Sequence, residues 1–430
     1  MSLDFFVLGL LAASLVVIFL GFPVAFALGF CSLIYLWFEG FPLTIVAQKL
    51  AFSIEGFAIL AIPLFMLAGS LMNAARITDR IFDFANLAVG RIPGGLGHVN
   101  ILASLIFAGM SGSVLADVAG LGRMELRAME RQGYDKRFAV GITLASSVVG
   151  PILPPSVPMV LFGILAEVSV VGLFLGGVMP ALVITACLMV YVFIIGRQRG
   201  YHNREWPRPG ALLRAFVKAF PPLLTPVIIV GGMTLGIFSP TEAATVAVLY
   251  ALFLSAVVYR DLGLVTFLDV IQETVISTSK LLFIITNALL FGWVLTVADV
   301  PQQIAAVSET WFDSPWMFLL AVNIVLLILG ALIENAILLF ILGPMLLPVA
   351  VDTYGIDPLH FGVIVVLNIM IGQYTPPMGL SLFIMRDISG LSLGQVSWAV
   401  APFLLPLIAG LMIVTYFPIV VLWLPRTLGF

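Results

Sequence analysis

The sequence has little charge. Only 10% of its 430 residues are Asp, Glu, Lys or Arg, whereas 62% are hydrophobic, and the mean hydropathy is +1.19. Soluble domains carry roughly 25% charged and about 45–50% apolar residues. This shortage of charge excludes a cytosolic enzyme, a disordered chain and a nucleic-acid-binding protein. It predicts a protein whose main solvent is lipid.

Cysteine and histidine are also scarce. Cys31 and Cys187 lie in apolar segments, and we interpret both as small buried hydrophobic side chains. His98, His202 and His360 lack the spacing of a metal site, so no transition metal is expected. The sequence contains no P-loop, G-x-S-x-G or H-E-x-x-H motif, and it therefore predicts neither ATP hydrolysis nor another enzymatic activity.

Apolar stretches of membrane-spanning length fill most of the chain. At about 20 apolar residues per crossing, it has room for roughly ten spans. Segments 78–90 and 299–312 are amphipathic, so we expect them to lie on the membrane surface, and the polar loop 197–210 marks the midpoint. The 39 glycines and 26 prolines are many for lipid-embedded helices. Because broken backbone is tolerated there only beside protein or a polar cavity, they predict discontinuous helices.

Basic residues predict the orientation, since cytoplasmic loops carry an excess of Lys and Arg. They cluster at 123–137 and 197–218 and flank 78–90. If these regions are cytoplasmic, Lys49 and Arg426 are the only basic residues on the outer side. This holds if segments 95–122 and 316–350 do not cross the membrane, and each enters and leaves on the same side. The arrangement predicts about ten crossings, a pair of re-entrant hairpins, and both termini outside.

The two halves of the chain match at one fixed offset. A shift of 222 residues relates Pro154-Pro155 to Pro376-Pro377, Gly150 to Gly372, and Pro180 to Pro402. Each half holds an odd number of crossings, so the second copy is predicted to lie inverted in the membrane. Inverted repeats with broken helices near the midplane are typical of secondary transporters.

The predicted fold class is therefore an all-α polytopic membrane protein with two inverted-topology repeats. Each repeat is expected to have about five crossings, including a broken helix, and a re-entrant helical hairpin. The first repeat covers 1–200, with scaffold spans within 3–75, a hairpin at 95–122, a broken helix at 138–167 and a span at 170–196. A cytoplasmic connector at 201–219 leads to the second repeat at 220–430, with scaffold spans within 220–298, a hairpin at 316–350, a broken helix at 359–386 and a span at 397–424.

The hairpin tips are candidate ion sites. Ser111-Gly112-Ser113 lies near the middle of the first hairpin, and arms of about a dozen residues at 1.5 Å each reach roughly halfway through a 30 Å core. Small and hydroxyl residues there allow a tight turn and leave oxygens for a cation such as Na⁺, although helix packing by small residues is the alternative. Glu334-Asn335 forms the second tip, where the acid is expected to neutralise a cation or to hold the tip together. A solvated turn is the alternative, if 316–350 makes two full crossings.

The motifs GPILPPS at 150–156 and GQYTPPMG at 372–379 predict two broken helices. Consecutive prolines cannot continue a helix, so preceding carbonyls are left free and a new half-helix begins. Free carbonyls and the Ser156 and Thr375 hydroxyls suit Na⁺, and a half-helix N-terminus suits a carboxylate. A purely structural kink is the alternative. Expected substrate contacts are Ser113, Pro155, Ser156, Asn335 and Pro377.

The chain resembles the large membrane subunit, the DctM type, of the tripartite ATP-independent periplasmic (TRAP) transporters in the ion-transporter superfamily. The resemblance covers essentially the whole chain. It is carried by GFPVAFALG at 21–29, IPLFMLAGSLM at 62–72, GRIPGGLGHVNILASLIFAGMSGSVLADVAGLG at 90–122, GPILPPSVPMVLFG at 150–163, SPTEAA at 239–244, FGWVLTVADVPQQI at 291–304 and QYTPPMG at 373–379.

The resemblance implies an elevator transporter, in which a domain holding both hairpins and both broken helices moves against a scaffold. It implies Na⁺ as the coupling ion, with no other cofactor, bound between each tip and its broken helix. By motif, the first site takes Ser111, Gly112, Ser113, Gly150 and Ser156, and the second takes Gly330, Glu334, Asn335, Thr375 and Gly379. Family members often have aspartate where this chain has Glu334.

The resemblance also implies partners and a substrate class. We expect a small four-helix membrane subunit as a separate chain, because this sequence begins at the first repeat, and a periplasmic binding protein that docks on the acidic outer face. The expected function is Na⁺-coupled uptake of a small organic acid, such as a dicarboxylate or a sugar acid, across the bacterial inner membrane. The alternative is an ion-coupled anion carrier or antiporter of the same superfamily that needs no binding protein.

Overall fold

The computed structural model describes residues 9, 12–14, 16–18, 20, 22–53, 55–75, 77–112, 114–201, 210–376 and 379–430. Within these ranges every regular element is a helix, as the apolar composition predicts. The first half contains α2 (Val24–Phe38), α3 (Thr44–Phe52), α4 (Ala61–Ala74), α5 (Ile77–Val89), α6 (Gly95–Ser111), α7 (Val114–Arg131), α8 (Lys136–Ser146), α9 (Val157–Leu165) and α10 (Val170–Gln198). The second half contains α11 (Ala211–Thr234), α12 (Pro240–Phe253), α13 (Leu264–Val297), α14 (Val300–Trp311), α15 (Pro315–Gly330), α16 (Asn335–Pro348), α17 (Pro358–Gly372), α18 (Leu380–Ser389), α19 (Leu393–Tyr416) and α20 (Ile419–Thr427).

Two helix pairs occupy the predicted hairpins. Helices α6 and α7 meet at Gly112, whose left-handed backbone (φ 58°) ends α6. Helices α15 and α16 meet at residues 331–334. The first pair is longer than the predicted 95–122, because α7 continues to Arg131 through residues whose exposed side chains are polar. Apolarity alone therefore underestimates a helix whose last turns carry exposed polar residues.

Both predicted breaks are present. Helix α8 continues as a short 3-10 turn at Ser147–Val149, and α9 starts only at Val157. Helix α17 ends at Gly372, and α18 starts at Leu380. Asp135 and Asp357, which are related by the 222-residue offset, cap α8 and α17 by accepting hydrogen bonds from backbone N–H groups two residues later. The helix boundaries thus follow the offset, while the inverted relation of the halves stays a prediction.

Seven helices in the described part of the chain are long and apolar enough to cross a membrane, or up to eight if the bent pair α14–α15 counts as one. Several predicted crossings fall short of that length because they are interrupted, as α8–α9 and α17–α18 are, or short, as α2 is. The predicted surface helices correspond to α5 and α14. The predicted connector 201–219 is shorter than expected, because α11 begins at Ala211 and its first turns include Arg214 and Lys218.

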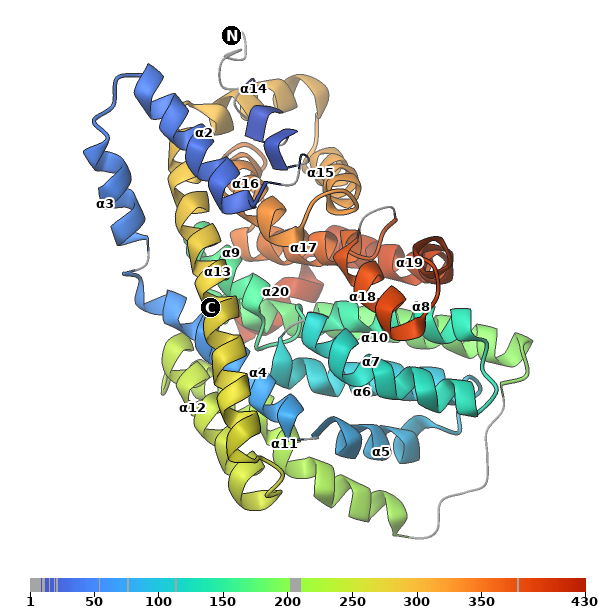
Figure 1. Cartoon of the computed structure of the whole chain (residues 1–430). Coiled ribbons are helices and arrows are strands. Elements are labelled where there is room, and N and C mark those ends of the chain that lie inside the picture. The colour runs from blue at the N-terminus through green and yellow to red at the C-terminus, as the bar shows by residue number, and fades with distance from the viewer. Residues whose placement is uncertain are drawn as a thin grey trace.

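The helices pack in two groups (Figure 1). The long helix α13 packs against α2 and α4, and α4 packs against α12. In the other group, α8 packs against α19, α18 against α7 and α16 against α9, so the hairpin and broken helix of each half contact elements of the other half. Helix α16 contacts α13, which joins the second hairpin to the first group. This arrangement brings the breaks and the tips into one region.

Candidate binding site

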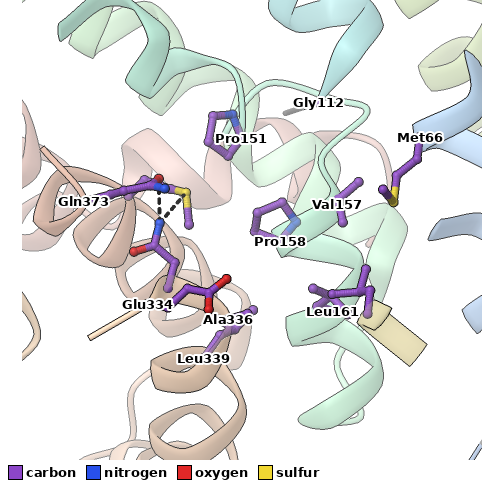
Figure 2. Close-up of a pocket in the computed structure, with 13 residues that line it drawn as sticks. Met66, Gly112, Pro151, Val157, Pro158, Leu161, Glu334, Ala336, Leu339 and Gln373 are labelled. Carbon is purple, nitrogen blue, oxygen red and sulfur yellow. Dashed lines mark hydrogen bonds between the residues drawn. The ribbon is translucent and has the colours of Figure 1, made fainter. Parts of the chain in front are cut away.

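A cavity of about 230 Å³ lies where the tips and breaks of both halves meet (Figure 2). Gly112 of the first tip and Glu334 and Asn335 of the second line it, together with Pro151 and Gln373 of the two breaks. Met66 of α4 and Leu281 of α13 line the same cavity. The cavity is therefore bounded by the hairpins and broken helices on one side and by the α4–α13 group on the other.

The first tip touches the first break through backbone atoms. A Cβ atom added to Gly112 would meet the carbonyl oxygen of Pro155, in a backbone conformation that L residues rarely adopt. Ser156 caps α9, since its hydroxyl accepts a hydrogen bond from the Met159 N–H (3.2 Å). The same hydroxyl donates to the Pro151 carbonyl. The sequence predicted free carbonyls before the break, but this one already has a hydrogen-bond partner. Gly150 is buried in the turn just before it.

The second tip contacts the second break in a similar way. A Cβ on Gly330 would lie 2.9 Å from the Cα of Gly372, so α15 and α17 approach closely at their ends. The Asn335 amide donates to Gln373 Oε1 at 2.7 Å and approaches Met370 Sδ at 3.7 Å. These contacts hold the tip against the break from within the cavity wall (Figure 2).

The remaining residues of the second predicted site are placed by the break. The Thr375 hydroxyl donates to the Ile371 carbonyl (3.2 Å), and Gly379 precedes α18, where a Cβ would meet the Gln373 carbonyl. Glu334 stands at the N-cap of α16 without a side-chain capping bond and is exposed to the cavity. Among the described residues, no basic side chain forms an ion pair with it.

Some predicted contacts cannot be placed. Ser113 and Pro377 lie outside the described residues, and of Ser111 only the backbone, which ends α6, is described. Pro155 is buried and presents its carbonyl to Gly112. The structure therefore assembles Gly112, Pro155 and Ser156 at the first constellation, and it groups Gly330, Asn335 and Gly379 around the second break.

The cavity wall combines oxygen atoms with helix N-termini. Helices α9 and α16 both begin at the cavity, and the N-terminal end of a helix attracts anions. Asn335 Oδ1 is buried and has no hydrogen-bond partner among the described residues. Glu334 is the charged member of the described lining, and the lining contains no basic residue. A bound anion would therefore depend on helix dipoles and hydrogen bonds, while the carboxylate favours a cation nearby.

Sequence reasoning missed several polar contacts. Gln373 lies in the GQYTPPMG motif, and nothing in that motif indicates that it is the partner of Asn335. The Ser147 and Tyr374 hydroxyls lie 2.8 Å apart and join the two broken helices. Asn368 donates to Asn323 Oδ1 at 2.6 Å, which ties α17 to α15. A polar side chain inside an apolar helix is a signal for such pairs, but the partner is not visible in one sequence.

Comparison with known proteins gives consistent matches. The model of the DctM component of tripartite ATP-independent periplasmic transporters matches residues 11–420. The chain is 44% identical over 410 residues to the sialic acid TRAP transporter large permease protein SiaM of Vibrio cholerae, covering 95% of this chain and 96% of that one. It is 43% identical over 390 residues to the C4-dicarboxylate TRAP transporter large permease protein DctM of Pseudomonas aeruginosa, covering 89% and 90%. A solved structure, the YdaH transporter of Alcanivorax borkumensis, shares the fold with a TM-score of 0.64 at 15% identity, covering 89% of this chain and 90% of that one.

Proposed function

The chain belongs to the DctM family of tripartite ATP-independent periplasmic transporters, and from this premise we propose that it couples Na⁺ entry to the uptake of a small organic acid. It is a multi-pass membrane permease rather than an enzyme. The observation that carries the proposal is the cavity shared by two hairpin tips and two helix breaks. Broken helices that meet in this way are a recurrent setting for coupled ion and substrate sites.

Na⁺ would bind between each tip and its break. The close backbone contacts of Gly112 with Pro155 and of Gly330 with Gly372 support these positions, because they bring carbonyl-rich turns together. Hard cations are bound by such oxygen atoms. The proposed ligands are drawn from Ser111, Gly112, Ser113, Gly150 and Ser156 in the first site and from Gly330, Glu334, Asn335, Thr375 and Gly379 in the second.

The substrate would occupy the cavity itself. The N-termini of α9 and α16 favour a carboxylate, and Asn335 contributes a polar side chain to the cavity wall. Relatives named for sialic acid and for C4-dicarboxylates agree with an organic acid. Ser113, Pro155, Ser156, Asn335 and Pro377 are the proposed contacts.

Transport would follow an elevator mechanism. In this proposal the hairpins and broken helices move together past α4 and α13, with the cavity at the boundary between them. The partners would be a small four-helix membrane subunit and a periplasmic binding protein, in the inner membrane of a bacterium. The binding protein would deliver the acid to the outer side.

Reconstituted vesicles test the proposal directly. Purified chain, small subunit and loaded binding protein should take up the acid when an inward Na⁺ gradient is imposed. Uptake that is unchanged when K⁺ replaces Na⁺ would contradict Na⁺ coupling. Full uptake by the chain alone, without either partner, would instead favour a self-sufficient carrier or antiporter of the same superfamily.

A further inference from the structure

Two acidic residues lie in the interior of the first hairpin, behind the cavity. Asp117 and Glu125 both belong to α7, and the two residues are only 2% and 1% exposed. A spacing of eight residues places them on one face of a helix. Neither residue lines the cavity, and neither belongs to the ion sites proposed above.

Glu125 ends a chain of hydrogen bonds between the hairpin and α8. Its Oε2 accepts from the Asn100 amide at 2.8 Å, and the same amide donates to Thr143 Oγ1 at 2.7 Å. The Ser146 hydroxyl donates to Asn100 Oδ1 at 2.6 Å, and Ser104 donates to Ser146 at 3.1 Å. The bonds come from α6, α7 and α8, so the chain fixes the three helices together.

Asp117 lies at the other end of this chain. It interacts with the Ser104 side chain, and it acts electrostatically on Glu125 and on Tyr374. The Tyr374 hydroxyl already shares a hydrogen bond with Ser147. Among the described residues, Asp117 thus lies near neutral hydroxyl groups and a second acid.

Each carboxyl group retains one oxygen without a partner. Asp117 Oδ1 and Glu125 Oε1 are buried and accept no hydrogen bond from the described residues. A buried carboxylate with one unpaired oxygen and no counter-ion is unfavourable, and such a group takes up a proton instead. Two carboxylates that act on each other increase this cost.

No basic side chain of the described residues compensates the pair. On α7 itself Arg123, Arg127 and Arg131 are exposed, as is Glu130. The elements packed against α7 are α4 and the 3-10 turn, which carry no charged residue, and α6, α8 and α18. Their titratable groups point elsewhere: His98 bonds the Pro93 carbonyl, Arg137 is exposed, Lys136 pairs with Glu130 at 3.3 Å, and Arg386 pairs with Asp387 at 2.8 Å.

We propose that Asp117 and Glu125 each carry a proton in this conformation, which makes the core of the first hairpin a proton-binding site. Loss of either proton places a negative charge where α6, α7, α8 and the second break meet. The packing that supports Gly112 at the cavity is weakened as a result. Transport therefore decreases as the pH rises, independently of the Na⁺ sites.

Infrared spectroscopy of the purified, detergent-solubilised chain tests the protonation itself. The carbonyl stretching band of protonated, buried carboxyl groups should be present in the wild type at neutral pH. Asp117→Asn and Glu125→Gln should each remove part of this band. Glu130→Gln is the matched control, because Glu130 is an exposed acid on the same helix, and it should leave the band unchanged.

Uptake measurements extend the test and rest on the proposed transport function, whereas the infrared band does not. Asp117→Asn should reduce the pH dependence of uptake while the half-saturating Na⁺ concentration stays that of the wild type. A spectrum without the band of protonated carboxyl groups would overturn the proposal. So would an ionised carboxylate band that shifts when Na⁺ is added and that is absent from Asp117→Asn. If Asp117→Asn does not fold, Glu125→Gln provides the same comparison.

Discussion

Gly112 shows how a single residue determines the geometry of a tip. Its backbone is left-handed (φ 58°), and the position of its missing Cβ is occupied by the Pro155 carbonyl oxygen. Both facts require glycine, since other L residues pay about 1–2 kcal/mol for this conformation before any clash. The sequence predicted a tight turn here, but only the structure shows that the turn touches the break.

Gly112→Ala should therefore impair transport through two effects, the backbone strain and the clash of its Cβ with the Pro155 carbonyl oxygen. Gly133→Ala is the control, because Gly133 has a similar φ of 80° with nothing near its Cβ. Both variants should lose about 1 kcal/mol or more of stability, measured by thermal unfolding in detergent, but only Gly112→Ala should abolish Na⁺-driven uptake. Equal uptake by the two variants would contradict the proposed contact.

The Asn335–Gln373 hydrogen bond should couple the second tip to its break. A double-mutant cycle with Asn335→Ala and Gln373→Ala is expected to give a coupling of about 1 kcal/mol, or roughly fivefold in the half-saturating Na⁺ concentration. The same cycle on Asn323 and Thr415, which share a buried 3.0 Å hydrogen bond, is the control. If the effects of Asn335→Ala and Gln373→Ala on the half-saturating Na⁺ concentration are additive, the hydrogen bond between the two residues does not contribute to ion binding.

At the scale of elements, helix starts were the most predictable feature. Ser239 and Glu242 of the SPTEAA motif form a capping box at the start of α12, and the two double-proline motifs fall in the two breaks. Such signals are local, because a cap or a proline acts on its own turn. Boundaries without such a signal were less predictable: α7 ends later and α11 starts earlier than their apolar stretches, through turns with polar and basic residues.

A comparison of two serine N-caps distinguishes an effect on the first break from the general loss of a helix cap. Ser156→Ala and Ser169→Ala each remove an N-cap, from α9 and α10, and each should cost about 1 kcal/mol of stability. Ser156→Ala also removes the hydrogen bond to Pro151 inside the break. We expect a larger loss of Na⁺-driven uptake for Ser156→Ala than for Ser169→Ala at similar thermal stability; equal losses would make the Ser156 contact irrelevant to transport.

At the scale of the whole molecule, the orientation can be tested by labelling. Glu130 and Glu167 are both exposed, and the broken helix α8–α9 lies between them. Single cysteines at these positions, with Cys31 and Cys187 replaced by alanine, should react with a membrane-impermeant reagent from opposite sides, Glu130→Cys from the cytoplasm. Labelling from the same side would contradict the predicted single crossing.

The elevator proposal predicts that linking the two helix groups stops transport. Met66 of α4 and Val157 of α9 line the same cavity from opposite groups (Figure 2). In the cysteine-free background, Met66→Cys with Val157→Cys should be joined by a short bifunctional reagent, and uptake should be lost only after linking. Each single variant treated with the reagent is the control; retained uptake after complete linking would argue against relative motion of the groups.

The sequence by itself determined the membrane environment, the all-helical class, the family and the positions of tips and breaks. These follow from hydropathy, proline and glycine, which act through solvent and local backbone. Only the tertiary structure decided that both tips and both breaks share one cavity, that Gln373 is the partner of Asn335, and that Asp117 and Glu125 are buried with no basic partner among the described residues. Such pairings join residues far apart in the chain, and they depend on how helices pack rather than on the pattern within any one of them.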